Sequence, residues 1–318
     1  AGCFGRRKSR VHSGVAAAGP MSAVSSRVSG IWLAAAAYTQ WGLLPVYWKW
    51  LHPTPASQIL CHRIVWSFLL LGLVLTLRGT GRQWLRRLRD ARTLRIYTLS
   101  GLLLTANWFI YIWAVNAGLI VEASLGYFMN PLVNVCLGIF FFHERLRPLQ
   151  WLAFLLAAAG VVYLTVIYGR LPWIGLALAL TFGVYGLLRK WGPLSSVEGL
   201  SFETMVVAPM ALAILLWSEY QGAGVFGHSV WWKNLLLIGA GIVTALPLLC
   251  FAAAARVTDL SLMGILQYIA PTLQFLVGVI IYHEPFTGAR VTGFLFIWSA
   301  LLVFSLEGLW NHWHFRKR

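Results

Sequence analysis

The chain has 318 residues, of which 59% are hydrophobic and 11% are charged, and its formal net charge is +16. Soluble domains carry about 25% charged residues, so this composition excludes an ordinary soluble protein and indicates a chain surrounded largely by lipid. The basic balance alone would also fit a nucleic-acid-binding protein, but the distribution of the charges argues against that class.

Ten apolar segments are long enough to cross a bilayer, which takes about 20 residues. In chain order they lie at roughly 29–51, 57–77, 95–117, 119–142, 149–168, 171–189, 200–217, 233–255, 260–282 and 288–308. The connections between them are short and leave no room for an inserted soluble domain. The sequence therefore predicts an all-α integral membrane protein with ten transmembrane helices.

The two ends of the chain are basic. The first twenty residues contain no acidic side chain, and we expect residues 1–27 to form a disordered basic leader or tail. Residues 310–318 are expected to form a short basic tail in the cytoplasm.

The basic residues also predict an orientation. If the amino end is cytoplasmic and the chain crosses ten times, 20 of the 25 Lys and Arg residues fall on the cytoplasmic side, including seven arginines between Arg78 and Arg95. Lys and Arg in short loops favour the cytoplasm, so both termini are predicted there. The arginine-rich loop is best explained as an anchor at anionic headgroups. RNA binding by this loop is a weaker alternative, and we predict no nucleic-acid partner.

The chain repeats itself with an offset of 140 residues. The segment "YFMNPLVNVCLGIFFFHE" begins at Tyr127 and aligns with "QYIAPTLQFLVGVIIYHE" from Gln267. At this offset the following pairs coincide: Pro131 with Pro271, Gly138 with Gly278, His143 with His283, Glu144 with Glu284, and Gly101 with Gly241. The repeat predicts two halves, residues 28–168 and 169–309, of five helices each.

An odd number of helices in each half has a geometric consequence. The second copy enters the membrane from the opposite side, so the two halves are inverted relative to each other. Inverted repeats are typical of secondary transporters, which hold their substrate near the bilayer midplane between the halves.

Each half resembles an EamA domain of the drug/metabolite transporter superfamily, through Pro-x6-Gly followed by an acid after an aromatic run. Several stretches are similar to RarD-type proteins, a branch labelled chloramphenicol-sensitive: "AYTQWGLLPVYWKWL", "CHRIVWS", "NWFIYIWAVNAG", "EASLGYFMNPL" and "LQYIAPTLQFLVGVIIYHEPF". The resemblance covers nearly all of residues 28–308. It implies a ten-helix bundle with a central cavity in a bacterial plasma membrane, and movement of a small metabolite, without identifying that metabolite.

Two charged residues inside predicted spans are candidates for function. Arg63 either extends to the outer headgroups or holds a carboxylate or other anion of a substrate, and we favour the second reading because intramembrane charges are usually functional. Its neighbour His62 is a weaker candidate, for which a hydrogen-bonded structural role is the simpler expectation. Glu203 occupies the corresponding region of the second half, where it either accepts a coupling proton or caps a helix near the cytoplasmic headgroups.

Stripes of polar and aromatic residues complete the predicted site. Such side chains face the bundle interior or water, and they serve either as contacts between helices or as the lining of a substrate pocket. The candidates are Tyr38 and Trp41 in the first helix, Asn107 and Tyr111 in the third, Tyr127, Asn130 and Asn134 in the fourth, and Gln267 and Gln274 in the ninth. Glu144 and Glu284 are expected to cap helices instead.

Signatures of enzymes, metal sites and nucleotide-binding loops are missing from the sequence. We therefore predict a protein that is not an enzyme and needs no cofactor, namely a gradient-driven transporter of an amino-acid-like metabolite, organic anion or drug by alternating access. The alternative is a membrane-embedded sensor or assembly subunit that uses the same fold without flux. The expected partners are a small-molecule substrate and the lipid bilayer, and the sequence is compatible with a homodimer.

Overall fold

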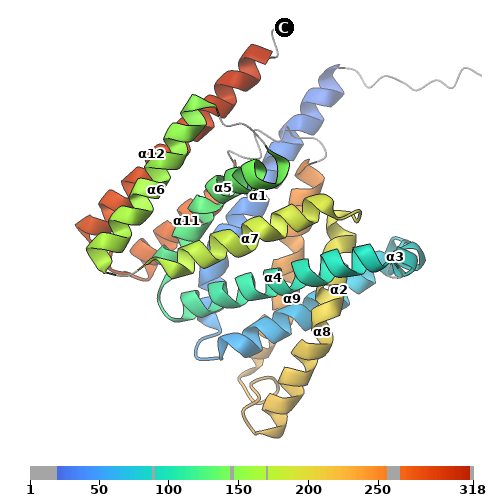
Figure 1. Cartoon of the computed structure of the whole chain (residues 1–318). Helices are drawn as coiled ribbons and strands as arrows, with labels where there is room; N and C mark the ends of the chain where they lie inside the picture. Colours follow the sequence, from blue (N-terminus) through green and yellow to red (C-terminus); the bar gives the residue numbers. More distant parts are fainter. Residues whose placement is uncertain (1–19, 88–89, 144–146, 170, 256–265, 316–318) are drawn as a thin grey trace, which may run out of the picture.

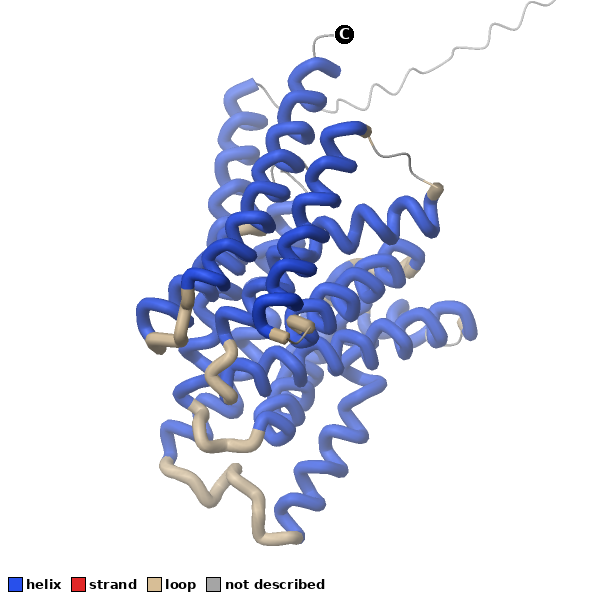
Figure 2. Tube along the Cα trace, turned by 60° about the vertical axis from the view of Figure 1, so that its left-hand side comes forward, coloured by secondary structure: helices blue, strands red, loops and turns tan. Residues whose placement is uncertain are grey.

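The computed structural model describes residues 20–87, 90–143, 147–169, 171–255 and 266–315. Within these ranges the chain is helical and contains no strand (Figure 2). The elements are α1 (Pro20–Trp50), α2 (Ala56–Leu77), α3 (Gly81–Arg87), α4 (Ala91–Asn116), α5 (Ile120–Phe142), α6 (Pro148–Tyr168), α7 (Trp173–Trp191), α8 (Ser196–Tyr220), α9 (Trp231–Ala255), α11 (Ile269–Leu276), the π-helix η1 (Val277–Ile281) and α12 (Gly288–Phe315).

The predicted spans correspond to these helices. Seven described helices, α2, α4, α6, α7, α8, α9 and α12, are long and apolar enough to cross a membrane. The first and fourth predicted spans are occupied by α1 and α5, and the ninth by α11 with η1 over the residues that the structure describes.

The helices differ from the expectation in three places. α1 begins at Pro20, within the expected leader, and α12 continues to Phe315 into the expected tail. The arginine-rich loop contains the short helix α3, which was not predicted. Hydropathy marks the part of a helix that lies in lipid, whereas the helix itself ends where its backbone hydrogen bonds end.

Local capping explains where two helices begin. The Asp90 carboxylate accepts the amides of Arg92 and Thr93 at the start of α4, and the hydrogen bonds from Thr93 hold the pKa of Asp90 below its usual range. At the start of α8, Ser195 and Glu198 form a reciprocal capping box.

Glu284 caps a helix, as expected, but not the helix that follows it. Its two carboxylate oxygens accept the amides of Ile120 and Val121 at 2.7 and 2.8 Å, at the start of α5 in the other half of the chain. The side chain is buried, so the charge lies close to the positive end of the α5 dipole. Its predicted counterpart Glu144 lies outside the described residues.

The helices pack in pairs that link the two halves. Figure 1 shows α6 and α12 side by side, and each of the other main contacts also joins the halves: α5 with α7, α1 with α9 and α11, α2 with α8 and α9, and α4 with α7 and α8. Glycines permit the close crossings. A Cβ on Gly101 would lie 3.1 Å from the carbonyl oxygen of Glu203, and one on Gly126 would lie 2.6 Å from that of Gly175.

Replacing Glu284 by alanine is expected to destabilise the protein by about 1–3 kcal/mol, because two buried amides of α5 lose their acceptors. Thermal unfolding of the purified protein in detergent measures this loss. Glu219→Ala, at an exposed carboxylate, serves as the control and should unfold close to the wild-type temperature. Equal melting temperatures for Glu284→Ala and the wild type would contradict the capping role.

Candidate functional site

Arg63 is deeply buried. It lies about two turns into α2, and only 4% of its surface is exposed, so it does not extend to the headgroups. Its Nε donates a hydrogen bond of 2.8 Å to Thr244 Oγ1 on α9. The first half of the chain therefore supplies a cation that is held by a hydroxyl of the second half.

Aromatic rings surround the Arg63 guanidinium. Its Cζ lies 3.8 Å from the ring centroid of Trp108 on α4 and 5.3 Å from that of Trp48 on α1. Cation–π attraction partly replaces the hydration that the charge has lost. Nη1 is buried and has no hydrogen-bond partner among the described residues. The arrangement leaves one side of a planar, fork-shaped donor ready for an anionic acceptor.

Predicted polar residues extend from this cation along α4 and α5. Tyr111 and Tyr127 lie close enough to Arg63 to interact with it electrostatically, and their rings contact each other edge to face with centroids 5.6 Å apart. One turn beyond Tyr127 on α5, the buried Asn130 leaves its Oδ1 without a partner among the described groups. The side chain of Asn134 lies outside the described residues.

A second aromatic group closes the space between α1, α9 and α11. Tyr38 and Trp41 contact each other and Phe251 with centroid distances of 5.6–6.1 Å. Gln274 is buried beside them and donates its Nε2 to the Trp41 carbonyl at 3.2 Å, while its Oε1 has no partner in the described part of the chain. Gln267 is half-buried in the turn that precedes the main part of α11.

Asn107 is used in a contact between helices. Its amide nitrogen donates to the Leu178 carbonyl and to Thr181 Oγ1 on α7, each at 2.9 Å. This is the interhelical role that was weighed against pocket lining, and it joins α4 of the first half to α7 of the second.

His62 lies under a loop that sequence analysis did not single out. Its ring is 5.2 Å from that of Phe226, and Phe226 also lies 6.1 Å from Trp66. The buried Nε2 of His62 has no hydrogen-bond partner among the described residues. Residues 221–230, which we name the lid loop, thus place an aromatic ring over the residue next to Arg63.

Gln58 fastens the lid loop to α2. Its Nε2 donates to the Ala223 carbonyl at 2.8 Å, and its Oε1 accepts the amide of Val225 at 3.1 Å. An exposed hydrogen bond of 2.5 Å between His228 Nε2 and Glu219 Oε1 lies nearby in sequence. Neither Gln58 nor Phe226 belongs to a periodic pattern, so only the fold could reveal that Gln58 bonds to the lid loop and that Phe226 lies beside His62.

Glu203 is buried in a second polar cluster and does not cap α8, since Ser195 and Glu198 do so. Its Oε1 accepts Ser100 Oγ at 2.7 Å and lies 3.4 Å from Nη1 of Arg189. The capping alternative for Glu203 is therefore wrong.

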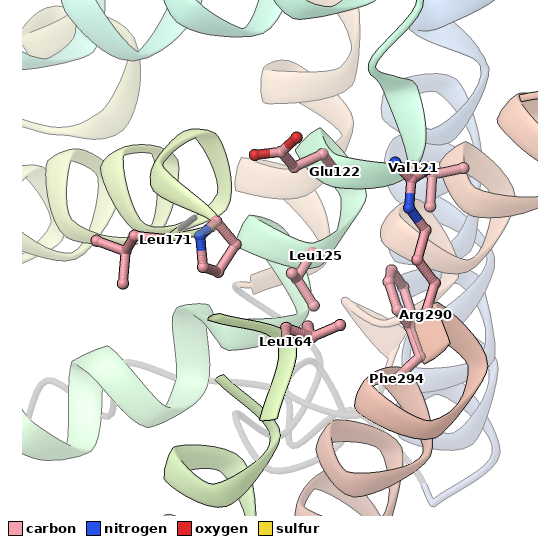
Figure 3. Close-up of a pocket in the computed structure, with 8 residues that line it drawn as sticks. Val121, Glu122, Leu125, Leu164, Leu171, Arg290 and Phe294 are labelled. Atoms are coloured by element: carbon pink, nitrogen blue, oxygen red, sulfur yellow. The ribbon is translucent and has the colours of Figure 1, made fainter. Parts of the chain in front are cut away.

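A small cavity of about 50 Å³ lies elsewhere, between α5, α6, α12 and the residues that precede α7. It is lined by Val121, Glu122, Leu125, Leu164, Leu171, Pro172, Arg290 and Phe294. Figure 3 shows the side chain of Arg290 extending toward Val121, whereas the carboxylate of Glu122 points away from it. None of the predicted site residues lines this cavity, so it is separate from the surroundings of Arg63.

Comparisons with known proteins agree with this architecture. Residues 28–166 match the model of the EamA-like transporter family. A Vibrio cholerae protein named an uncharacterized transporter is 46% identical over 88% of this chain and 93% of its own length. The uncharacterized transporter YojE of Bacillus subtilis is 46% identical over 87% of this chain and 94% of its own. Protein RarD of Escherichia coli is 42% identical over 89% of this chain and 95% of its own.

A crystal structure of another protein superposes with a TM-score of 0.58 over 89% of this chain and 98% of that chain. At 20% identity this likeness shows the fold alone. The match to the family model and the similarity to the relatives identify the chain as a multi-pass membrane protein that belongs to the EamA-like transporter family, among its RarD-type members.

Proposed function

We propose that this protein is a gradient-driven transporter that moves a small metabolite carrying a carboxylate or another anionic group, by alternating access. The observation that carries the proposal is the buried Arg63, which is enclosed by rings and keeps Nη1 without a partner among the described residues. A buried cation is costly unless an acceptor completes its coordination. The anionic group of a substrate supplies that acceptor during transport.

The neighbouring groups favour an organic anion that also carries donors. Asn130 Oδ1 and Gln274 Oε1 are acceptors without a partner among the described residues, so they suit an ammonium, amide or hydroxyl group at a distance from the carboxylate. Amino-acid-like metabolites, organic anions and drugs with such groups fit this description. The aromatic walls suit the apolar part of the same molecule.

The proposed mechanism uses two inverted repeats, residues 28–168 and 169–309. The packing supports this. If the helices of the two repeats correspond in order, each main contact between helices has a corresponding contact or corresponds to itself. The corresponding helices are α1 and α7, α2 and α8, α4 and α9, α5 and α11, and α6 and α12. His143 and His283, which are 140 residues apart, both adopt a positive φ, of 53° and 50°. Rocking of one repeat against the other around Arg63 would give alternating access.

The proposed location is a bacterial inner membrane with both termini in the cytoplasm. The excess of Lys and Arg in the loops on that side supports this orientation. In Figure 1 the start of α1 and the C-terminus lie toward the same end of the molecule, opposite the lid loop between α8 and α9. The lid loop would therefore face the outside.

Arg63→Gln is expected to lower flux on the order of tenfold or more, because a charge-assisted hydrogen bond contributes about 1.5–3 kcal/mol to binding. The measurement is counterflow into proteoliposomes of labelled amino acids, organic acids and amphenicols. The exposed arginine variant Arg92→Gln is the matched control and should transport at the wild-type rate. Arg63→Lys, which keeps the charge without the fork, should recover only part of the flux.

Two results would contradict the proposal. Undiminished counterflow by folded Arg63→Gln would remove Arg63 from substrate recognition. Saturable binding of a solute by the wild type, with no counterflow of that solute, would favour a sensor over a transporter.

The lid loop should control access to the position beside Arg63. In a background without other cysteines, His62→Cys is expected to react slowly with a soluble maleimide, because residue 62 is 5% exposed beneath Phe226. Adding Gln58→Leu removes both hydrogen bonds to the loop and should raise the labelling rate severalfold. A labelling rate that does not change on this addition would show that the loop does not cover the site.

A further inference from the structure

The Glu203 cluster lies at the other end of α8 from the lid loop. Glu203 is near the start of α8 and the lid loop follows its end, so the two are separated by roughly 25 Å along the helix axis. The cluster joins the two halves of the chain, because Ser100 on α4 belongs to the first half while Glu203 and Arg189 belong to the second.

The charge of Glu203 has few compensating contacts. Only 1% of its surface is exposed, and besides Ser100 it meets the Tyr185 hydroxyl and one Arg189 nitrogen, each at 3.4 Å. A contact of this length with a single nitrogen is weaker than the two-bonded pairing that Arg and a carboxylate usually make. The ion pair is therefore marginal, and the neutral acid is an accessible alternative in this enclosed position.

Arg189 already contacts other partners besides Glu203. Its Nη2 lies 3.5 Å from the Ser195 carbonyl and 3.3 Å from the Ser196 carbonyl, and its Cζ lies 5.4 Å from the Tyr97 ring centroid. The guanidinium is also more exposed than the carboxylate, at 16% against 1% of the side chain. Arg189 can thus leave Glu203 without remaining unpaired, whereas Glu203 cannot leave the interior.

The backbones of α4 and α8 pack closely beside the Glu203 carboxylate. Gly101 packs directly on the backbone of Glu203, so α4 and α8 touch at the position of the carboxylate. The Tyr97 hydroxyl accepts the amide of Leu194 at 2.9 Å and thereby ties α4 to the turn between α7 and α8. A change of charge at Glu203 would therefore alter the packing where α4 of the first half meets α7 and α8 of the second.

We propose that Glu203 is a proton-binding site whose protonation releases Arg189 and loosens the junction of α4 with α7 and α8. One proton from the solvent adds to a carboxylate oxygen, the attraction to Nη1 of Arg189 is lost, and the guanidinium stays bonded through Nη2 to the Ser195 and Ser196 carbonyls. The role of this step in transport rests on the proposed function, where it would couple proton entry to opening of this end.

The groups that face Glu203 are few. From α7 they are Tyr185 and Arg189, and from α4 they are Tyr97 and Ser100. Glu198, with Arg87 of α3 at 3.7 Å, lies at the mouth of the cluster, and the described parts of α2 and α9 contribute Leu71 and Ala245 to the surrounding apolar core. Arg189 is the partner whose release reports the protonation state of Glu203.

Hydrogen–deuterium exchange with the proton as the only ligand tests this inference. In purified full-length protein, amides of residues 97–104 and 192–204 should exchange on the order of tenfold faster at mildly acidic than at neutral pH, after correction for intrinsic rates. Glu203→Gln, which cannot ionise, should show the faster exchange at both pH values.

Two further variants make the outcome decisive. Glu307→Gln alters another buried carboxylate, paired with Arg147 at 2.7 Å, and should keep the wild-type pH response. Ser100→Ala removes the hydroxyl donor and should shift the pH at which protection is half lost, so it tests the site even if Glu203→Gln does not fold. A wild type without a pH response, or a response that survives in folded Glu203→Gln, would overturn the inference. Because no substrate is used, this result and the transport test of Arg63 can fail independently.

Discussion

Desolvation of the Arg63 guanidinium is the constraint on which the rest of this structure depends. A cation that is 96% buried needs compensation, and the protein provides one hydroxyl from Thr244 and the faces of Trp48 and Trp108. These partners come from α9, α1 and α4, so keeping the charge in place requires helices of both halves to meet around it. The same requirement explains why a loop with Phe226 covers the neighbouring His62, since bulk water there would weaken the cation–π contacts.

The two halves carry opposite charges at related places. Arg63 on α2 is held by a hydroxyl of α9, and Glu203 on α8 is held by a hydroxyl of α4. In each case a charged group of one half is bonded to the third long helix of the other half. The lid loop closes the end near Arg63, while Tyr97, Leu194 and Arg189 close the end near Glu203. The proposed rocking motion would loosen one of these contacts while the other holds.

The sequence predicted most of the long helices, but it did not predict which side chains bond to one another across the fold. Lipid imposes apolar segments of a fixed length, so the long helices were predictable, and the intramembrane positions of Arg63 and Glu203 stood out by their charge. Contacts between distant segments leave no local signal: the bond of Gln58 to the lid loop, the capping of α5 by Glu284 and the use of Asn107 between α4 and α7 depend on the tertiary fold. The helix ends at Pro20 and Phe315 were missed because hydropathy does not extend beyond the bilayer.

Alternating access is the central claim, and cross-linking the two halves at the lid loop tests it most directly. Gln58 and Ala223 touch through a 2.8 Å hydrogen bond, so Gln58→Cys with Ala223→Cys, in a background without other cysteines, can be joined by a short bifunctional thiol reagent. Counterflow of a transported solute should stop when a reducible linker joins the pair and return when it is cleaved, while either single variant keeps transporting. Unimpaired flux through the cross-linked protein would contradict the account, because the two halves would then not need to separate at this end.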